Sequence, residues 1–298
     1  MIKTTFILVF LLGFITFSLV AQSNELRRNI AQILDSKNAV VGVSVCGIEN
    51  NDTLSINGDD HFPMQSVFKF HIALAILHEV DKGKFSLDQK IFIKKSDLLP
   101  DTWSPIRGKY PNGNVALSLS ELLQYTVAQS DNNGCDILLR LIGGTKVVNN
   151  YIQGLGIKDV SIVATEEEMH KEWNVQFTDW TTPKAATQLL YKFYNGKILS
   201  EKSFHFLWNV MAATNTGKVR IKSQLPPGTI VADKTGSSDT NKEGITAAVN
   251  DIGIVTLPNG NHFAICVFVS NSKESETVND KIIADISKLA WDYFKEKE

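Results

Sequence analysis

Hydrophobic and polar positions alternate along the chain with two periods, one typical of strands and one typical of helices. Valine-rich or alternating runs predict strands over residues 39–48, 53–56, 230–233, 245–257 and 263–270. Apolar positions at helical spacing predict helices over residues 25–36, 67–80, 118–143, 183–213 and 280–295. This order predicts an α/β (α+β) fold, in which both ends of the chain build one antiparallel sheet covered by helices, beside an all-helical subdomain.

The first 21 residues have the pattern of a signal peptide for export. Lys3 precedes an apolar run from Phe6 to Val20, and the small residue Ala21 follows it. The run spans about 15 residues, which is short for a membrane helix, although a retained N-terminal anchor is the alternative. Cleavage is compatible with positions after Ala21 and after Ser23. We therefore expect a secreted, periplasmic protein with no stable membrane anchor after cleavage of the signal.

Composition excludes several classes of function. The 298 residues are 43% hydrophobic and 21% charged, as in a globular protein and unlike a disordered one. A formal net charge of −2 gives no sign of a nucleic-acid partner. The three cysteines and six histidines form no metal-ligand motif, so no metal and no organic cofactor is expected. Cys46 and Cys266 fall in predicted strands as buried thiols, and whether they pair stays open.

The first candidate for chemistry is a serine and a lysine, Ser66 and Lys69, at the start of a long apolar helix. Three residues apart on a helix, they face the same side. A serine hydroxyl becomes a nucleophile when a base lies within hydrogen-bond reach, and a desolvated lysine could be that base. Taken alone, Ser66 could also be an ordinary helix cap. Ser270 and Lys273 have the same spacing, but they lie in a polar stretch after a strand.

The second candidate is the tripeptide Ser130-Asp131-Asn132, which occurs once. The hydroxyl of Ser130 can pass a proton to a leaving nitrogen, and the amide of Asn132 can bind a substrate carbonyl. Without other evidence, the same tripeptide would be read as a polar loop or a helix cap.

The third candidate is Lys234-Thr235-Gly236, at the end of a predicted strand. A lysine, a hydroxyl and a glycine at a strand edge suit an anionic substrate that lies along the backbone. The backbone N–H of the next residue, Ser237, would point into the same space.

The order and spacing of the three motifs indicate one family. Ser130 follows Ser66 by 64 residues, and Lys234 follows Ser130 by 104 residues. The ordered set resembles the signature of class A serine β-lactamases and penicillin-binding enzymes, over essentially the whole mature chain. The resemblance implies a two-subdomain fold. The expected subdomains are the helical residues 63–212 and the sheet-bearing residues 22–62 with 213–298.

The resemblance implies hydrolysis of β-lactam antibiotics through an acyl-serine intermediate, and hence antibiotic resistance, by a monomer without a cofactor. Ser66 would attack the β-lactam carbonyl, and Ser130 would deliver a proton to the ring nitrogen. The backbone N–H groups of Ser66 and Ser237 would form the oxyanion hole. Two alternatives share the motifs: a D-alanyl-D-alanine peptidase, and a non-catalytic sensor that β-lactams only acylate.

A glutamate between the second and third motifs separates β-lactamases from the peptidases. Class A enzymes resemble one another in a Glu-x-x-Leu-Asn segment, and Glu166 matches its first residue, with Met169 and His170 in place of Leu-Asn. The resemblance implies that Glu166 activates the hydrolytic water. It also implies that Glu166 and Lys69 share the role of acylation base, and which of them dominates stays open.

The same resemblance assigns the contacts with substrate. The residues expected to bind it are Asn132, Arg220, Lys234, Thr235, Gly236 and Ser237. Asn132 would hold the side-chain amide, and Arg220 would help Lys234 and Thr235 to hold the carboxylate, unless Arg220 is an ordinary surface residue. Trp103 would be the aromatic wall of the site, or a core tryptophan.

Two departures from the family pattern bear on substrate range. Most class A enzymes carry an asparagine where Asp136 stands, and His170 replaces an asparagine of the glutamate segment. An ionised carboxylate only accepts hydrogen bonds, so the usual tie between these parts cannot form in the same way. Both features resemble a cephalosporinase-leaning, extended-spectrum subgroup, which implies a roomy site that favours cephalosporins over carbapenems. The alternative is an Asp136 that is protonated or satisfied by backbone N–H groups, without effect on substrates.

Overall fold

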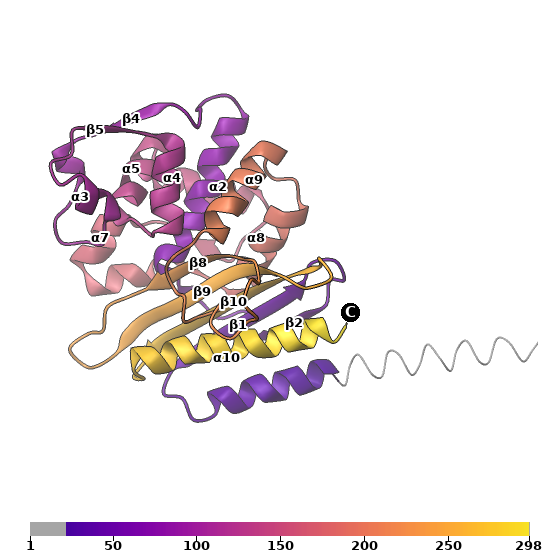
Figure 1. Ribbon diagram of the computed structural model, residues 1–298. Coiled ribbons are helices and arrows are strands. Elements are labelled where there is room, and N and C mark those ends of the chain that lie inside the picture. The colour runs from indigo at the N-terminus through magenta and orange to yellow at the C-terminus, as the bar shows by residue number, and fades with distance from the viewer. Residues whose placement is uncertain (1–21, 298) are drawn as a thin grey trace, which may run out of the picture.

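A five-stranded antiparallel sheet crosses the molecule in the order β2-β1-β10-β9-β8 (Figure 1). The computed structural model describes residues 22–297, so the predicted signal peptide lies outside the described residues. The strands are β1 (Val40–Gly47), β2 (Thr53–Ile56), β8 (Val231–Ser237), β9 (Thr246–Thr256) and β10 (His262–Ser272). Both ends of the described chain therefore supply the sheet, as the sequence predicts.

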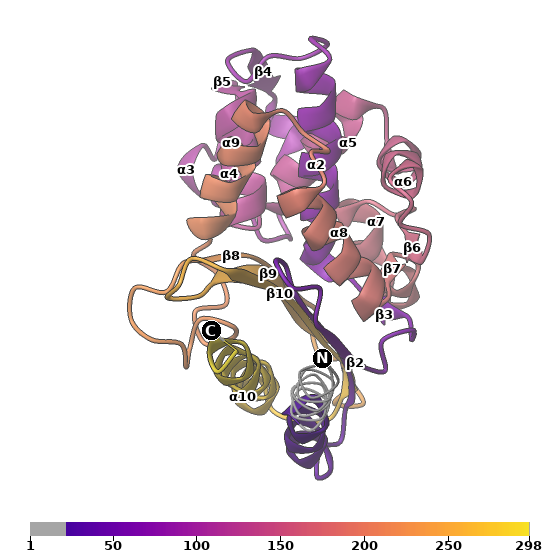
Figure 2. The ribbon, with the colours of Figure 1, turned by 90° about the vertical axis from the view of Figure 1, so that its right-hand side faces the viewer.

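Helices cover both faces of this sheet (Figure 2). The helical residues 22–34 and α10 (Glu276–Lys295) lie on one face, and the larger helical layer lies on the other. Side chains of β10 alternate between the two cores because successive residues of a strand point to opposite faces. Phe263 and Ile265 pack with α10, whereas Ala264 and Cys266 pack with the helical layer.

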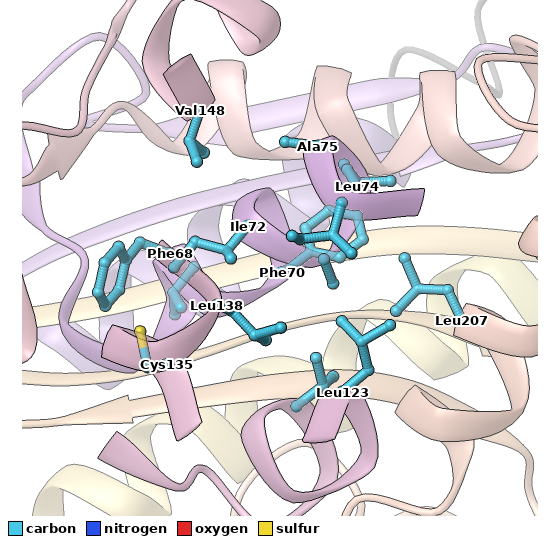
Figure 3. Packing of buried hydrophobic residues seen from close by; sticks show 14 of the residues in the cluster. Phe68, Phe70, Ile72, Leu74, Ala75, Leu123, Cys135, Leu138, Val148 and Leu207 are labelled. Atoms are coloured by element: carbon cyan, nitrogen blue, oxygen red, sulfur yellow. The ribbon is translucent and has the colours of Figure 1, made fainter. Parts of the chain in front are cut away.

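The helical layer is built around α2 (Phe68–Asp81). Its residues from Phe68 to Leu77 are all buried, because neighbouring helices surround this part of α2 (Figure 3). The other helices of the layer are α3 (Pro105–Lys109), α4 (Leu119–Ala128), α5 (Asn132–Ile142), α6 (Thr145–Gly154), α7 (Glu166–Lys171), α8 (Pro183–Asn195) and α9 (Glu201–Ala212). Three short 3-10 segments, Gln65–Val67, Lys95–Asp97 and Trp173–Phe177, complete the helical elements with assigned bounds.

Two small sheets complete the fold. β4 (Lys90–Ile93) pairs with β5 (Val115–Ser118) at the far end of the helical layer. The second sheet has the order β3-β7-β6, with β3 (Phe62–Pro63), β7 (Trp180–Thr181) and β6 (Val160–Ser161). Because β7 lies between β3 and β6, it joins two parts of the chain that are far apart in sequence.

The predicted fold class is confirmed, and its elements differ mainly at their ends. The helix predicted from residue 67 is preceded by the 3-10 turn that holds Ser66, and the region 118–143 divides into α4 and α5. Between these two helices the backbone of Ser130 has φ 59°, a left-handed conformation that ends α4. All three cysteines are buried free thiols. No helix within residues 22–297 is both long and apolar enough to cross a membrane.

Candidate active site

Ser66 lies in the turn that connects β3 to α2. The preceding residue, Gln65, has φ 48°, and its side chain donates a 2.6 Å hydrogen bond to Oε1 of Gln176. A positive φ is uncommon for a glutamine and costs free energy, which the surrounding contacts offset. The turn that presents Ser66 is therefore fixed by its contacts.

The amine of Lys69 is the centre of the site. Nζ lies 2.7 Å from Oγ of Ser66, 2.8 Å from Oε1 of Glu166, 2.9 Å from the carbonyl oxygen of Ser130 and 2.5 Å from Oδ1 of Asn132. Lys69 is completely buried, because these partners and the core of α2 surround it. The Oγ atom of Ser66 also lies 3.4 Å from Oε1 of Glu166. The structure thus brings together four of the predicted site residues around the amine of Lys69.

Lys234 approaches the same site from β8. Its Nζ donates to Oγ of Ser130 at 2.9 Å and to the carbonyl oxygen of Thr235 at 2.7 Å. Burial, and then repulsion by Lys69, lower the pKa of Lys234 from 10.5 to about 7. Near neutral pH the amine is therefore easily deprotonated, and an anionic group bound beside it would favour its charged form.

Glu166 is held at the first turn of α7. Thr165 caps this helix through a reciprocal pair of hydrogen bonds with Glu168. Asp136 on α5 accepts hydrogen bonds from the backbone N–H groups of Glu166, at 2.9 Å, and Glu167, at 3.0 Å. α5 and the glutamate segment are therefore tied together. The tie consists of backbone N–H groups that donate to the Asp136 carboxylate, as in the alternative interpretation of Asp136 in the sequence analysis. Burial, and then repulsion by Glu166, raise the pKa of Asp136 from 3.8 to about 6.

Asp179, just before β7, ties the Glu166 segment to the Ser66 segment. Its Oδ1 accepts hydrogen bonds from the N–H groups of Val163, at 2.7 Å, and Ala164, at 2.9 Å. Its backbone carbonyl accepts from the N–H of Met64 at 2.9 Å. Oδ2 is buried and has no hydrogen-bond partner in the described part of the chain, and burial raises the pKa of this carboxyl to about 7.

Arg220 is buried behind the end of β8, so it is not a surface residue. Its Nε donates to Oδ1 of Asp280 on α10 at 2.7 Å, and its Nη2 donates to Oγ of Ser237 at 2.7 Å. Its Nη1 donates to the carbonyl oxygens of Gly236 and Asn250. These contacts place the guanidinium beside Ser237, at the edge of the strand that carries the Lys-Thr-Gly motif.

A cleft of about 650 Å³ opens in front of Ser66. Its lining includes Asn132, Glu166, His170 and Ser237. A smaller cavity of about 220 Å³ lies at the other side of Ser66, and its lining residues are Trp103, Ser130, Asn132, Thr216, Gly217, Arg220, Thr235, Gly236 and Ser237. Every predicted substrate-binding residue except Lys234, which lies buried beside Ser130, therefore lines one of the two spaces.

Trp103 lies at the mouth of the site and not in the core. Its side chain is 63% exposed, and its indole N–H donates to the carbonyl of Gln129 at 2.9 Å. Among residues 22–297, no group of three or more histidine, cysteine or acidic side chains could hold a metal ion.

Sequence reasoning missed several partners of the site residues. Thr102 accepts a 2.6 Å hydrogen bond from Nδ2 of Asn132, and the hydroxyls of Thr216 and Thr235 are 2.7 Å apart. Asp280, the partner of Arg220, lies 60 residues further along the chain. Thr102, Thr216 and Asp280 belong to no motif, so no signal in a single sequence distinguishes them from other polar residues.

The fold, and the close approach of Ser66, Lys69 and Glu166, have the features of the β-lactamase class. A family model described as "Beta-lactamase enzyme family" matches residues 25–294. The Beta-lactamase VEB-1 of Pseudomonas aeruginosa is 52% identical over 279 residues, which are 93% of each chain. The Extended-spectrum beta-lactamase PER-1 of the same organism is 43% identical over 283 residues, covering 95% of this chain and 92% of the relative.

A solved structure gives the same result. The TLA-3 extended-spectrum beta-lactamase has 59% sequence identity and a TM-score of 0.91, over 92% of this chain and 99% of that one. The chain belongs to the beta-lactamase enzyme family. It is a class A β-lactamase, which hydrolyses the β-lactam ring and thereby gives antibiotic resistance.

Proposed function

We propose that Ser66 is the nucleophile of this hydrolase and that Lys69 and Glu166 activate it. One observation carries the proposal: the hydroxyl of Ser66 lies within 2.7 Å of Nζ of Lys69 and 3.4 Å of Oε1 of Glu166. A serine hydroxyl attacks a carbonyl only if a base removes its proton. The two neighbours can take this proton directly or pass it from one to the other.

The hydrogen-bond partners of Lys69 favour a path that ends on Glu166. The carbonyl of Ser130, the amide oxygen of Asn132 and the carboxylate of Glu166 can only accept hydrogen bonds. An ammonium has three N–H bonds, and Oγ of Ser66, at 2.7 Å, is a fourth acceptor around it. The Ser66 hydroxyl itself donates to Oε1 of Glu166 at 3.4 Å. In that arrangement the proton of Ser66 is directed to Glu166. A neutral Lys69 would instead accept it, so the two residues share the role of base.

The acyl-transfer step needs two further groups. The backbone N–H groups of Ser66 and Ser237 would stabilise the oxyanion, which is worth about 3 kcal/mol for one donor. Ser130 would protonate the departing ring nitrogen, and the 2.9 Å contact with the amine of Lys234 supports this role because the amine can supply a proton to the hydroxyl.

The substrate would be held by groups on both sides of Ser66. Arg220, Lys234 and Thr235 would bind its carboxylate, with Gly236 leaving room along β8. The amide of Asn132, fixed between Lys69 and Thr102, would bind the side-chain carbonyl of the substrate. We propose that the chain has two subdomains that meet at this site. One is residues 63–212, and the other is residues 22–62 with 213–298.

Glu166 would then activate the water that hydrolyses the acyl-enzyme. Its carboxylate lies beside the Ser66 hydroxyl and lines the open cleft, so a water molecule in the cleft can reach both. This feature argues against the two alternatives, a peptidase and a sensor, since both lack a base for rapid deacylation.

The preferred substrates would be cephalosporins, including bulky oxyimino ones. The cleft of about 650 Å³ beside α7 offers space for a large substituent. Two of the relatives, PER-1 and TLA-3, carry the description extended-spectrum. We further propose that the enzyme acts in the periplasm as a monomer without a membrane anchor, after removal of the signal peptide.

A chromogenic cephalosporin assay on the purified protein tests the proposed mechanism. Steady turnover of many equivalents per enzyme, with an adduct on Ser66 seen by mass spectrometry, is the expected result. A single stoichiometric burst would indicate a peptidase or a sensor, and absence of both burst and turnover would exclude Ser66 as the nucleophile.

A further inference from the structure

Asn250 on β9 is a buried asparagine that contacts the nucleophile turn from the sheet. It is completely buried, and it faces Gly236 of β8 in the register of the two strands. Its Nδ2 donates to the carbonyl oxygen of Pro63 at 2.8 Å and to that of Met64 at 3.1 Å. These carbonyls lie two and three residues before Ser66. One side-chain amide thus binds the main chain that leads into the nucleophile.

The contact is close because the cross-strand partner of Asn250 has no side chain. A Cβ atom on Gly236 would lie 2.5 Å from the carbonyl oxygen of Met64 and 3.2 Å from the nitrogen of Val67. Such a distance to backbone atoms forces a shift of the main chain. Gly236 therefore lets the turn rest against the sheet, and the amide of Asn250 fixes it there.

The orientation of the Asn250 amide follows from its neighbours. Both partners of Nδ2 are carbonyl oxygens, so a flipped amide would set Oδ1 against two acceptors. In the observed orientation Oδ1 is buried and has no hydrogen-bond partner among residues 22–297. An unsatisfied buried acceptor destabilises the folded state, so this side chain is a poor choice for stability alone.

We propose that Asn250 is a positioning residue for the oxyanion hole, because it sets the separation of the two N–H donors. This inference rests on the proposed function, in which the donors are the N–H groups of Ser66 and Ser237. Ser66 is two residues from Met64, one of the tethered carbonyls, and Ser237 follows Gly236, the strand partner of Asn250. The tether thus spans the gap between the two donors.

The same residue also contacts the carboxylate-binding side of the site. The backbone carbonyl of Asn250 accepts a 3.0 Å hydrogen bond from Nη1 of Arg220. Its main chain thus helps to hold the arginine, while its side chain holds the turn before Ser66. A substitution changes only the second of these contacts, so it should affect the oxyanion hole before it affects carboxylate binding.

The experiment compares Asn250→Ala with Thr187→Val. Thr187 is a matched control, since it is buried on α8 and its hydroxyl contacts the carbonyls of Pro183, at 2.9 Å, and Ser44 on β1, at 3.3 Å, neither of which belongs to the site. We expect kcat/KM for a cephalosporin to fall by about tenfold or more in Asn250→Ala, mainly through kcat, and to be unchanged in Thr187→Val.

Infrared spectroscopy of the acyl-enzyme distinguishes positioning of the oxyanion hole from a purely structural role of Asn250. The acyl-enzyme, accumulated in the Glu166→Ala background, has an ester carbonyl whose stretching band reports the hydrogen bonds of the oxyanion hole. Adding Asn250→Ala should move this band to higher wavenumber, because the two donors bind the oxygen less tightly. Thr187→Val in the same background should leave it in place.

An unmoved band, or unchanged kcat in a folded Asn250→Ala protein, would overturn the inference. If Asn250→Ala does not fold, Asn250→Ser, which keeps one donor, must show a smaller shift of the carbonyl band in the same direction. Absence of that shift would also overturn the inference. Failure of the proposed function is recognised separately, because the parent protein would then show no turnover and no adduct on Ser66.

Discussion

The carboxylate of Asp136 and the backbone of Glu166 are joined by a 2.9 Å hydrogen bond from the Glu166 N–H to Oδ1. A second bond, from the N–H of Glu167 to Oδ2, makes the contact bidentate. The first turn of α7 is thus held by an acceptor on α5. Because the two N–H groups use different oxygens of Asp136, an asparagine in the same orientation would set its N–H₂ against one of them. Glu166 is positioned through its main chain, which leaves its carboxylate free to face Ser66.

The hydroxyl of Ser66 is expected to be indispensable. Ser66→Ala should lower turnover by at least about a thousandfold and abolish covalent labelling by penicillins, because no other hydroxyl lies between Lys69 and Glu166 in the described site. Mass spectrometry and a cephalosporin assay measure the two effects. Ser270→Ala is the control, since the hydroxyl of Ser270 only donates to the carbonyl of Ala247. A penicilloyl adduct on Ser66→Ala protein would contradict the assignment.

Glu166 is expected to control the second half of the reaction. Glu166→Ala should still acylate, more slowly, and then accumulate an acyl-enzyme whose deacylation is slower by about a hundredfold or more, because the water loses its base. Stopped-flow kinetics with mass spectrometry of the trapped species separates the steps. Glu167→Ala should behave as the parent enzyme, since the carboxylate of Glu167 pairs with Lys171 on the surface. Normal turnover of Glu166→Ala would show that another group activates the water.

Substrate range is expected to follow the cleft beside α7. We predict a higher kcat/KM for early and oxyimino cephalosporins than for a carbapenem, because bulky substituents find room next to His170. The measurement is kcat/KM for a penicillin, both cephalosporins and a carbapenem. A penicillin preference of about tenfold over both cephalosporins, equal to about 1.4 kcal/mol in transition-state binding, would refute the prediction without affecting the enzyme class.

Binding of anionic substrates is expected to weaken in alkali. The pKa of Lys234 is about 7, so its positive charge is present below that pH and is lost as the pH rises through it. We expect kcat/KM to fall between about pH 7 and 9, since this ratio reports ionisation of the free enzyme. Lys234→Arg keeps the charge and should flatten the profile. Parallel profiles for the two proteins would exclude Lys234 as the titrating group.

Asp179 is expected to make stability depend on pH. Its pKa is about 7 in the folded protein against 3.8 ordinarily. A raised carboxyl pKa means that the folded state holds the proton more tightly, so stability is lost as the pH rises from about 4 to 7. Asp179→Asn keeps an oxygen for the N–H groups of Val163 and Ala164 and removes this dependence. Urea unfolding at pH 5 and 8 should show the variant gaining about 1–3 kcal/mol relative to the parent at the higher pH.

If the free energies of unfolding of Asp179→Asn and of the parent change in parallel between pH 5 and 8, the Asp179 carboxyl does not titrate in this range. Asp59→Asn is the control for this measurement. Asp59 is exposed and pairs with Lys184 on the surface, so its removal should leave the pH dependence unchanged.

The sequence predicts the site better than it predicts what holds the site in place. Ser66, Lys69 and Lys234 are recognisable because their chemistry requires particular side chains in a particular order. The supporting contacts of Asn250, Asp179 and Asp280 arise where distant parts of the chain meet. Many polar residues would serve as well at such positions in other folds, so residue type alone does not identify them.

The same contrast holds for the fold. The large sheet was predictable because β9 and β10 are long and apolar on both faces. The two-residue strands β3, β6 and β7 are not predictable from the sequence, because two residues are too few to show a hydrophobic period. The apolar pattern predicts a helix from residue 67, with Ser66 at its start, whereas Gln65–Val67 form a 3-10 turn in which Gln65 has φ 48° and contacts Gln176.

The sheet of β3, β7 and β6 links the catalytic steps to one small region of the backbone. β3 runs into the turn that bears Ser66, β6 runs toward Glu166, and β7 is hydrogen-bonded to both. A local opening at β7 would separate Ser66, the proposed nucleophile, from Glu166 while the large sheet and its two cores remained intact. On heating or in mild denaturant, the enzyme would then become a protein that binds antibiotic covalently but releases it slowly, before any global loss of structure is visible.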